Sequence, residues 1–379
     1  MGSLRSPVDE PASRPARLAL LALGGAALVA GLTGALVLIG TPMPEGTVRL
    51  AASHGILMTL GFLGTLISLE RAVALGRPWG YAAPLMTGAG GLALIAGAAA
   101  ANAAVALAAG GAVFVAMYVA FSRIQRSLHL VVEAVGAGAW PVAAVLVATG
   151  QPTSVVVPWL AAFLVLTVMG ERLELSALVR PSAPARAAFI VAAESFVGGV
   201  TLALVLPDAG VRIAGAGLLG IAAWAARYDL ARRTIHARGV TRFIAACLLP
   251  GYAWLAAAGV VWMAAGPVTS GPVYDSALHA IFLGFVISMV FGHAPVILPG
   301  VLRVPLPYHP AFYGHLALLH AGLLLRVIGG DVLDIPGAWR LGGTLNVVAV
   351  LLFLVVSIAA AGIGTAARRR ARPVPRPAT

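Results

Sequence analysis

The sequence lacks lysine, has a single cysteine, Cys247, and has few charged residues, only 10% of the chain. One thiol cannot form a disulfide framework or a multi-cysteine metal cluster within the chain. A soluble globular domain carries about 25% charged residues, so the low charge content excludes that class. The residues present are instead 60% hydrophobic, with a mean hydropathy of +0.97. These values are typical of a polytopic membrane protein.

The net charge of +12 comes from 25 basic residues, all arginine, against 13 acidic ones. Such an excess can indicate nucleic-acid binding, but the arginines fall at span ends, in alternate loops and in the two tails. With a cytoplasmic N-terminus, all but four lie inside, as the positive-inside rule requires. The four outside are Arg49, Arg212, Arg326 and Arg340. The charge therefore predicts topology, with both termini cytoplasmic, and no DNA or other nucleic-acid partner.

Twelve apolar segments are each close to the ~20 residues that cross a bilayer as a helix. We therefore predict an all-α fold of twelve transmembrane helices over residues 18–363, multi-pass in the lipid bilayer of the cell inner (cytoplasmic) membrane. The predicted spans are 18–40, 50–75, 80–100, 103–121, 128–149, 154–179, 186–207, 210–229, 241–266, 274–300, 310–329 and 338–363. Residues 1–17 and the basic, Pro-rich residues 364–379 are predicted to be disordered cytoplasmic tails.

Two histidines are predicted at the same depth on different helices. His54 lies about one turn inside the second span and His279 about one turn inside the tenth, and both spans run from outside to inside. A metal held between two helices requires two imidazoles at equal depth, and the iron of a haem ligated on both faces is the commonest intramembrane case. The same pattern also fits two histidines that each hydrogen-bond a neighbouring helix.

A family resemblance supports the haem. Residues 53–58, SHGILM, resemble the second transmembrane helix of subunit I of the haem-copper oxidases, and residues 278–299 are similar to that family's tenth helix. Those helices carry the two axial ligands of a low-spin haem in that family. The same stretches also resemble the NnrS family, haem- and copper-containing membrane proteins linked to nitric oxide, together with residues 170–172, Gly-Glu-Arg. The resemblance implies a haem b between His54 and His279 and a role in electron transfer or other redox or nitric-oxide-related chemistry.

The chain departs from the oxidases at their dinuclear oxygen-reducing centre. Spans 154–179 and 186–207, which would supply the copper ligands and the tyrosine, contain no histidine. The high-spin haem ligand of that family lies two residues from the low-spin one, but positions 277 and 281 are Ala277 and Ile281. The dinuclear centre is therefore expected to be absent. Whether the chain is an enzyme, and which partner subunit or redox partner it uses, stays open.

Four further histidines lie on the tenth and eleventh spans, toward the cytoplasmic side or mid-membrane. They are His293, His309, His315 and His320. Imidazole suits both copper and haem iron, so one hypothesis is a second site that holds copper or a second haem. The alternative is a hydrogen-bonded polar mouth without metal. A copper-handling membrane protein is accordingly one rival function.

Three of the external arginines flank the spans that would hold the haem: Arg49, Arg326 and Arg340. A guanidinium binds carboxylates through two hydrogen bonds, so these residues are candidates for neutralising the haem propionates. The oxidase resemblance implies this role for Arg326 and Arg340. The alternative is that all three only extend to the interface at span ends.

Five carboxylates lie within spans or at their inner ends, namely Glu70, Glu133, Glu171, Glu174 and Glu194. Buried charges usually pair with one another, and Glu70 and Glu171 each precede an arginine. Glu133 and Glu194 have no adjacent cation and are candidates for a proton or ion path. A secondary transporter is therefore the second rival function. A short repeated motif, Gly-Phe at 61–62 and at 284–285, is compatible with a bundle built from two related halves, 18–180 and 186–363.

Overall fold

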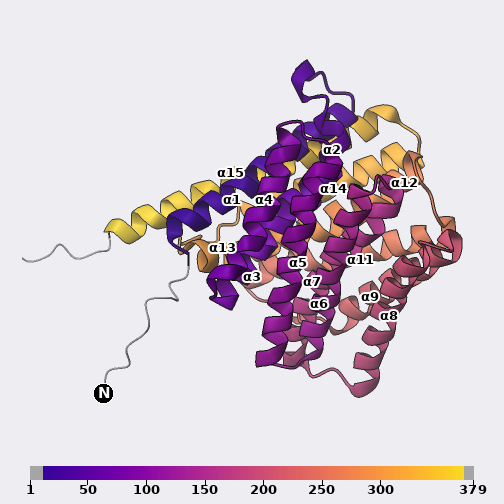
Figure 1. The fold of residues 1–379 in the computed structure, drawn as a ribbon. Coiled ribbons are helices and arrows are strands. Elements are labelled where there is room, and N and C mark those ends of the chain that lie inside the picture. The colour runs from indigo at the N-terminus through magenta and orange to yellow at the C-terminus, as the bar shows by residue number, and fades with distance from the viewer. Residues whose placement is uncertain (1–11, 371–379) are drawn as a thin grey trace, which may run out of the picture.

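The computed structural model describes residues 12–370, and every regular element within them is helical. The helices gather side by side in one bundle (Figure 1). In chain order the elements are α1 (Arg14–Leu38), η1 (Glu45–Thr47), α2 (Leu50–Ile56), η2 (Leu57–Gly64), α3 (Thr65–Leu75), η3 (Pro78–Tyr81), α4 (Ala82–Ile95), α5 (Ala100–Ile124), α6 (Leu128–Ala148), α7 (Thr153–Ser176), η4 (Ala177–Val179), α8 (Ala183–Leu202), α9 (Pro207–Tyr228), α10 (Ala231–Thr234), α11 (Gly239–Ala265), α12 (Gly271–His279), η5 (Ala280–Ile287), α13 (Ser288–Leu302), α14 (Phe312–Leu324), η6 (Leu325–Val332) and α15 (Pro336–Arg370).

Eleven helical segments of the described chain are long and apolar enough to cross a membrane, which confirms the all-α polytopic membrane fold. They coincide with eleven of the twelve predicted spans. The remaining one, 80–100, forms α4, a helix of 14 residues. At ~1.5 Å per residue α4 alone rises about 21 Å. The short helix η3 leads directly into it, so the segment returns from the end of α3 to the level of Arg49, just before α2. The chain turns at Gly97, where φ is +91°, and Arg49 donates to the Ile95 carbonyl over 2.9 Å, which caps the end of α4.

The ends of the bundle differ from the predicted tails. α1 begins at Arg14 and α15 continues to Arg370, so residues 14–17 and 364–370 are helical. Pro15 suits the first turn of a helix. The Arg17 side chain is 4% exposed and donates to the Val301 carbonyl over 3.1 Å, which ties the start of α1 to the end of α13. The parts of both predicted tails at 1–11 and 371–379 lie outside the described residues.

α7 lies in the middle of the bundle. It packs against α6 and α8 and also contacts η2 and η5, and it is the most buried of the candidate spans. α8, α9 and α11 pack together on one side, whereas α15 runs beside α1 on the other (Figure 1). Glycine allows the closest approach, because a Cβ at Gly217 of α9 would lie 2.3 Å from the Phe196 nitrogen of α8. This is the tight packing that small residues permit between membrane helices.

Three long helices contain a π-helical stretch. η2 continues α2, η5 continues α12, and η6 continues α14. η2 and η5 both contain Leu-Gly-Phe, at 60–62 and at 283–285. π-Helical turns are rare and occur often at functional sites. All three stretches contribute to the wall of one cavity.

Candidate functional site

A cavity of about 870 Å³ is lined by residues of α1, α2, η2, α7, α12, η5 and η6. His54, His279, Asp275, Arg326 and Trp339 all contribute to its wall, and we call it the histidine cavity. Its volume lies within the ~300–1,000 Å³ of small-molecule and cofactor sites. The structure thus places the two histidines predicted as a pair on one cavity, although they are far apart in the sequence.

The imidazole of His54 is held by α1. Its Nδ1 lies 2.7 Å from the carbonyl oxygen of Gly31. A carbonyl only accepts hydrogen bonds, so Nδ1 carries the hydrogen and Nε2 keeps its lone pair. The contact requires α1 to lie close to α2. Gly34 permits this approach because it has no side chain: a Cβ there would lie only 2.5 Å from the Leu50 oxygen. His54 therefore has the tautomer of a histidine that ligates a metal through Nε2.

His279 is held by its own helix. Its Nδ1 lies 2.9 Å from the backbone oxygen of Asp275, one turn earlier, and 3.2 Å from Oδ1 of the same residue. Both atoms are acceptors, so His279 also carries its hydrogen on Nδ1 and leaves Nε2 as the free nitrogen. A carboxylate behind the imidazole is the usual arrangement around a ligating histidine.

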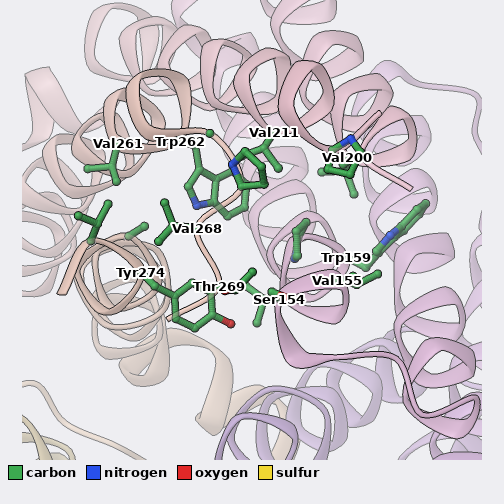
Figure 2. Close-up of a pocket in the computed structure, with 18 of the residues that line it drawn as sticks. Ser154, Val155, Trp159, Val200, Val211, Val261, Trp262, Val268, Thr269 and Tyr274 are labelled. Atoms are coloured by element: carbon green, nitrogen blue, oxygen red, sulfur yellow. The ribbon is translucent and has the colours of Figure 1, made fainter. Parts of the chain in front are cut away.

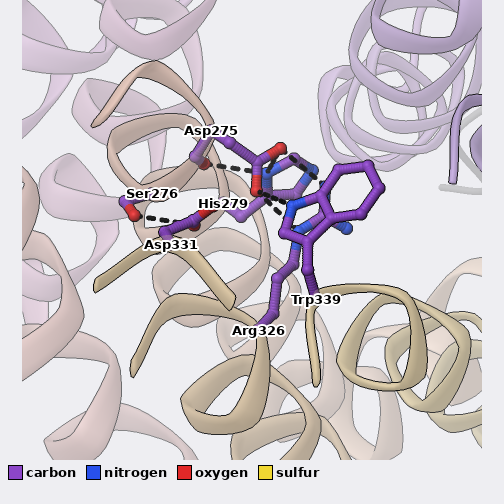
Figure 3. Close-up of polar contacts among 6 residues, drawn as sticks. All are labelled: Asp275, Ser276, His279, Arg326, Asp331 and Trp339. Atoms are coloured by element: carbon purple, nitrogen blue, oxygen red, sulfur yellow. Dashed lines mark hydrogen bonds and ion pairs between the residues drawn. The ribbon is translucent and has the colours of Figure 1, made fainter. Parts of the chain in front are cut away.

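Asp275 joins three helices at this wall of the cavity (Figure 3). Arg326 of η6 donates to both of its carboxylate oxygens, over 2.7 and 2.6 Å. Trp339 of α15 donates to Oδ2 over 3.1 Å, and its ring lies 5.1 Å from the Arg326 guanidinium carbon. Beside this cluster, Ser276 donates to Asp331 over 2.7 Å. The cluster fixes α12, which carries His279, against η6 and α15.

The three arginines predicted for haem propionates lie in different places. Arg326 lines the histidine cavity with its side chain 8% exposed, but two of its nitrogens donate to Asp275. Arg49 and Arg340 are exposed and do not line the cavity. Arg49 donates to the backbone at Gly46 and Ile95. The structure therefore brings one of the three to the predicted pair of histidines.

Two of the further histidines are satisfied by hydrogen bonds. His320 accepts at Nδ1 from the Trp254 indole over 3.1 Å, and its Nε2 lies 3.2 Å from the Ser288 hydroxyl. His309 is exposed, and its Nδ1 accepts from the Ala311 nitrogen over 3.1 Å. Neither imidazole lines the histidine cavity.

His293 and His315 each have at least one buried ring nitrogen without a hydrogen-bond partner among the described residues. His315 has no hydrogen-bond partner on either ring nitrogen and packs among Phe243, Phe291, Phe312 and Phe353. His293 is held at Nδ1 by the Met289 oxygen over 2.6 Å, and its buried Nε2 has no partner. Across residues 12–370, no group of three or more His, Cys, Asp or Glu side chains is placed to hold a metal ion. The four histidines therefore do not converge on one multi-histidine centre.

A smaller cavity of about 230 Å³ adjoins the histidine cavity. Ser154, Val157, Thr269 and Tyr274 line both cavities. Figure 2 shows Ser154, Thr269 and Tyr274 on one side of the smaller cavity. The rest of its wall is mainly apolar, including Trp262. A small apolar molecule could occupy this space beside the histidine cavity.

A second polar cluster lies where α3, α6 and α7 meet. The Arg71 guanidinium is ion-paired with Glu171 and lies 3.6 Å from Glu133. Glu133 is 1% exposed, and neither of its carboxylate oxygens accepts a hydrogen bond from the described residues. The predicted pairing of carboxylates with arginines thus occurs across helices. Glu194, the other ion-path candidate, is exposed on α8, and Glu174 is also exposed, 3.9 Å from His129.

Asp275 and Trp339 were not among the residues predicted from the sequence. A signal existed for Asp275, because it precedes His279 by four residues and so lies on the same helix face. Trp339 lies at a span end, where tryptophan is common because it favours the membrane–water interface. Its position therefore did not indicate a role in the site. Its bond to Asp275 depends on the packing of α15 against α12.

A protein-family model described as "Domain of unknown function (DUF8744)" matches residues 17–362. The match covers nearly all of the described helical bundle, including every residue of the histidine cavity. A search of curated proteins finds no match to the chain.

Proposed function

The chain belongs to the DUF8744 family, and we propose that it binds one b-type haem in the histidine cavity through His54 and His279. One observation carries this proposal. Both imidazoles line the same cavity, and each has its Nδ1 fixed on an acceptor, which leaves Nε2 as the nitrogen for a metal. Two neutral imidazoles are the ligand set of a low-spin haem, which supports electron transfer.

The other lining residues of the histidine cavity also fit a haem. Met58, Leu63, Phe282 and Leu283 supply apolar surface for a porphyrin. Arg326 brings a positive charge to the wall, and Asp275 offsets that charge and orients His279. When bound, the haem would supply one-electron redox chemistry, including electrons for a nitric-oxide-related reaction. The residues of the chain hold it, orient its ligands and keep it in an apolar surrounding.

We also propose a location for this redox or nitric-oxide-related role. The arginine distribution favours the cell inner membrane with both termini cytoplasmic, which sets His54 and His279 toward the outer side. A redox partner or partner subunit would deliver or remove electrons there. We assign no catalytic residue.

The test is haem analysis of the purified chain, by pyridine haemochrome and Soret absorption. We expect about one haem b per chain in the wild type. His54→Ala and His279→Ala should each lose the low-spin spectrum. Two controls should retain it: His236→Ala, which removes an exposed imidazole, and His320→Ala, which removes one with protein partners on both nitrogens. A wild type without haem, or ligand variants with an unchanged spectrum, would refute the assignment.

A secondary transporter is the second candidate, and Glu133 is the observation that favours it. A carboxylate that is 1% exposed and has no hydrogen-bond donor is suited to binding and releasing a proton. Uptake by proteoliposomes that depends on a proton or sodium gradient, in protein without haem, would select this candidate. Copper without haem in metal analysis would select a copper-handling role instead.

A further inference from the structure

A second large cavity lies next to the histidine cavity, further along η2 and η5 toward α3 and α13. It measures about 480 Å³ and is lined by residues of α1, η2, α3, α7, η5, α13 and α15, and we call it the lateral cavity. Two of its lining residues are exposed apolar side chains, Leu18 at 41% and Ile358 at 64%. Both belong to candidate membrane spans, so this opening faces the side of the bundle that lipid covers.

The lateral cavity has polar groups at a few points on an otherwise apolar wall. His293, Glu70 and Glu171 contribute to the lining, among side chains such as Phe353 and Leu28. His293 has Nδ1 fixed on the Met289 oxygen, so its Nε2 carries a lone pair that no described residue satisfies. A buried acceptor without a donor is costly. A ligand that brings an O–H group to this point would satisfy it.

The charges on the wall decide which kind of lipid fits. Glu70 and Glu171 are both acidic, and the neighbouring cation, Arg71, is already engaged by Glu171 and Glu133. Along this wall, the phosphate of a phospholipid or the carboxylate of a fatty acid would meet acidic groups, and no arginine is among the lining residues. A neutral ring that carries hydroxyl groups meets acceptors instead. The wall therefore favours a neutral amphipathic molecule over an anionic lipid.

The two cavities adjoin each other. Leu63 lines both of them. On η5, Val286 lines the lateral cavity and the next residue, Ile287, lines the histidine cavity. A ring bound in the lateral cavity would lie next to whatever His54 and His279 hold.

We infer that the lateral cavity binds a lipid-soluble quinol and that this quinol donates electrons to the group held in the histidine cavity. Oxidation of one quinol to the quinone breaks two O–H bonds and releases two electrons and two protons. Because each chain would hold one haem, the two electrons would leave in two one-electron steps, either to the haems of two chains or to one haem that is reoxidised between the steps. His293 Nε2 and the Glu171 carboxylate accept the protons. Ring binding depends only on the lateral cavity, whereas the electron transfer rests on the proposed haem.

Gly25 offers a variant that fills the cavity without a clash. It lines the lateral cavity, and a Cβ added there meets nothing within 4 Å. Gly198 is a matched control on α8, because a Cβ there also meets nothing within 4 Å and the residue lines neither cavity. Gly25→Phe should therefore block the ring, whereas Gly198→Phe adds the same side chain elsewhere on the helical surface.

The binding test uses decylubiquinol and the purified full chain in detergent, reduced with dithionite beforehand and kept anaerobic so that the ring stays a quinol, with empty micelles as background. We expect one ring per chain in the wild type and in Gly198→Phe, and at least tenfold weaker binding in Gly25→Phe and His293→Leu. Binding of the wild type no stronger than the micelle background would overturn the inference, as would unchanged binding in Gly25→Phe. Stoichiometric phosphatidylglycerol that decylubiquinol cannot displace would also overturn it, in favour of an anionic lipid.

The electron-transfer test follows the Soret band while decylubiquinol reduces ferric protein under anaerobic conditions. We expect one quinol to reduce two haems, and at least tenfold slower reduction in Gly25→Phe, which dithionite should still reduce completely. Equal rates in Gly25→Phe and the wild type would refute the donor role. Failure of the haem proposal can be distinguished from failure of this inference, because His54→Ala and His279→Ala protein without haem should still bind decylubiquinol.

Discussion

Arg326 of η6 and Asp275 of α12 are joined by two hydrogen bonds, from Nε to Oδ2 over 2.7 Å and from Nη2 to Oδ1 over 2.6 Å. This two-pronged contact fixes both the position and the orientation of the carboxylate. The same carboxylate lies 3.2 Å from Nδ1 of His279. An arginine predicted to bind propionates is thus connected to one of the predicted haem ligands through Asp275.

Breaking this pair should destabilise the protein. The Arg326 side chain is 8% exposed and that of Asp275 is 18% exposed, and removing one member of a buried pair costs about 3–5 kcal/mol because the other charge stays unpaired. We expect Asp275→Asn and Arg326→Met each to lower the thermal midpoint in detergent. The double variant should lose less than the sum of the two. Strictly additive losses would show that the two side chains do not interact.

Arg326 should also influence the redox potential of the proposed haem. Replacement by glutamine removes a positive charge from the cavity wall and leaves the Asp275 carboxylate uncompensated. Both changes favour the ferric state, so the midpoint potential should fall in Arg326→Gln. Arg340→Gln is the control, because Arg340 is exposed and outside the cavity. Potentiometric titration of the Soret band measures both, and equal midpoints would contradict the prediction.

His320 should prove to be a structural residue. His320→Phe leaves the Trp254 indole N–H without its acceptor, while Ser288 keeps its bond to the Cys247 oxygen. One buried donor without a partner costs about 1–3 kcal/mol. We expect a lower thermal midpoint with the haem content unchanged. Loss of the low-spin spectrum would instead identify His320 as an axial ligand.

Arg71 should matter more for stability than either carboxylate beside it. Arg71→Gln leaves Glu133 and Glu171 buried without a cation, so we expect a loss of about 3–5 kcal/mol. Glu133→Gln leaves the Arg71–Glu171 pair intact and should change stability by less than about 1 kcal/mol. Thermal unfolding with both variants in the same detergent measures the difference. A larger loss in Glu133→Gln than in Arg71→Gln would contradict this order.

Asp229 should make stability depend on pH. It lies just beyond α9, is 3% exposed, and its burial raises the pKa of the carboxyl above the ordinary value. A raised pKa in the folded state means that the protonated form favours folding below about pH 4, and that this contribution is lost as pH rises through the folded-state pKa.

Asp229→Asn tests this dependence. Asparagine stays neutral, and its side-chain oxygen can still accept from the Ala231 nitrogen. The variant should therefore have the higher thermal midpoint at pH 7, and its advantage should shrink toward pH 4. A difference between variant and wild type that stays constant across this range would show that Asp229 does not titrate with unfolding.

Much of the candidate site was visible in the sequence. His54 and His279 could be paired because their depth follows from their distance to the ends of apolar spans. The acceptors that hold them could not be predicted. Gly31 is on another helix, and its contact with His54 depends on how closely α1 packs against α2. His320 was a ligand candidate by depth, and only its neighbours Trp254 and Ser288 show that both nitrogens are used.

The sequence by itself determined the membrane class, the all-α fold and the positions of most spans, because hydropathy over about 20 residues is a local property of the chain. The tertiary structure decided which polar side chains meet. Arg326 bonds Asp275, Arg71 pairs with Glu171, and Arg49 caps the end of α4. These outcomes depend on the rotation and spacing of neighbouring helices, which contacts between distant residues set. Inside a bundle with little water, a polar group takes the partner that this packing supplies.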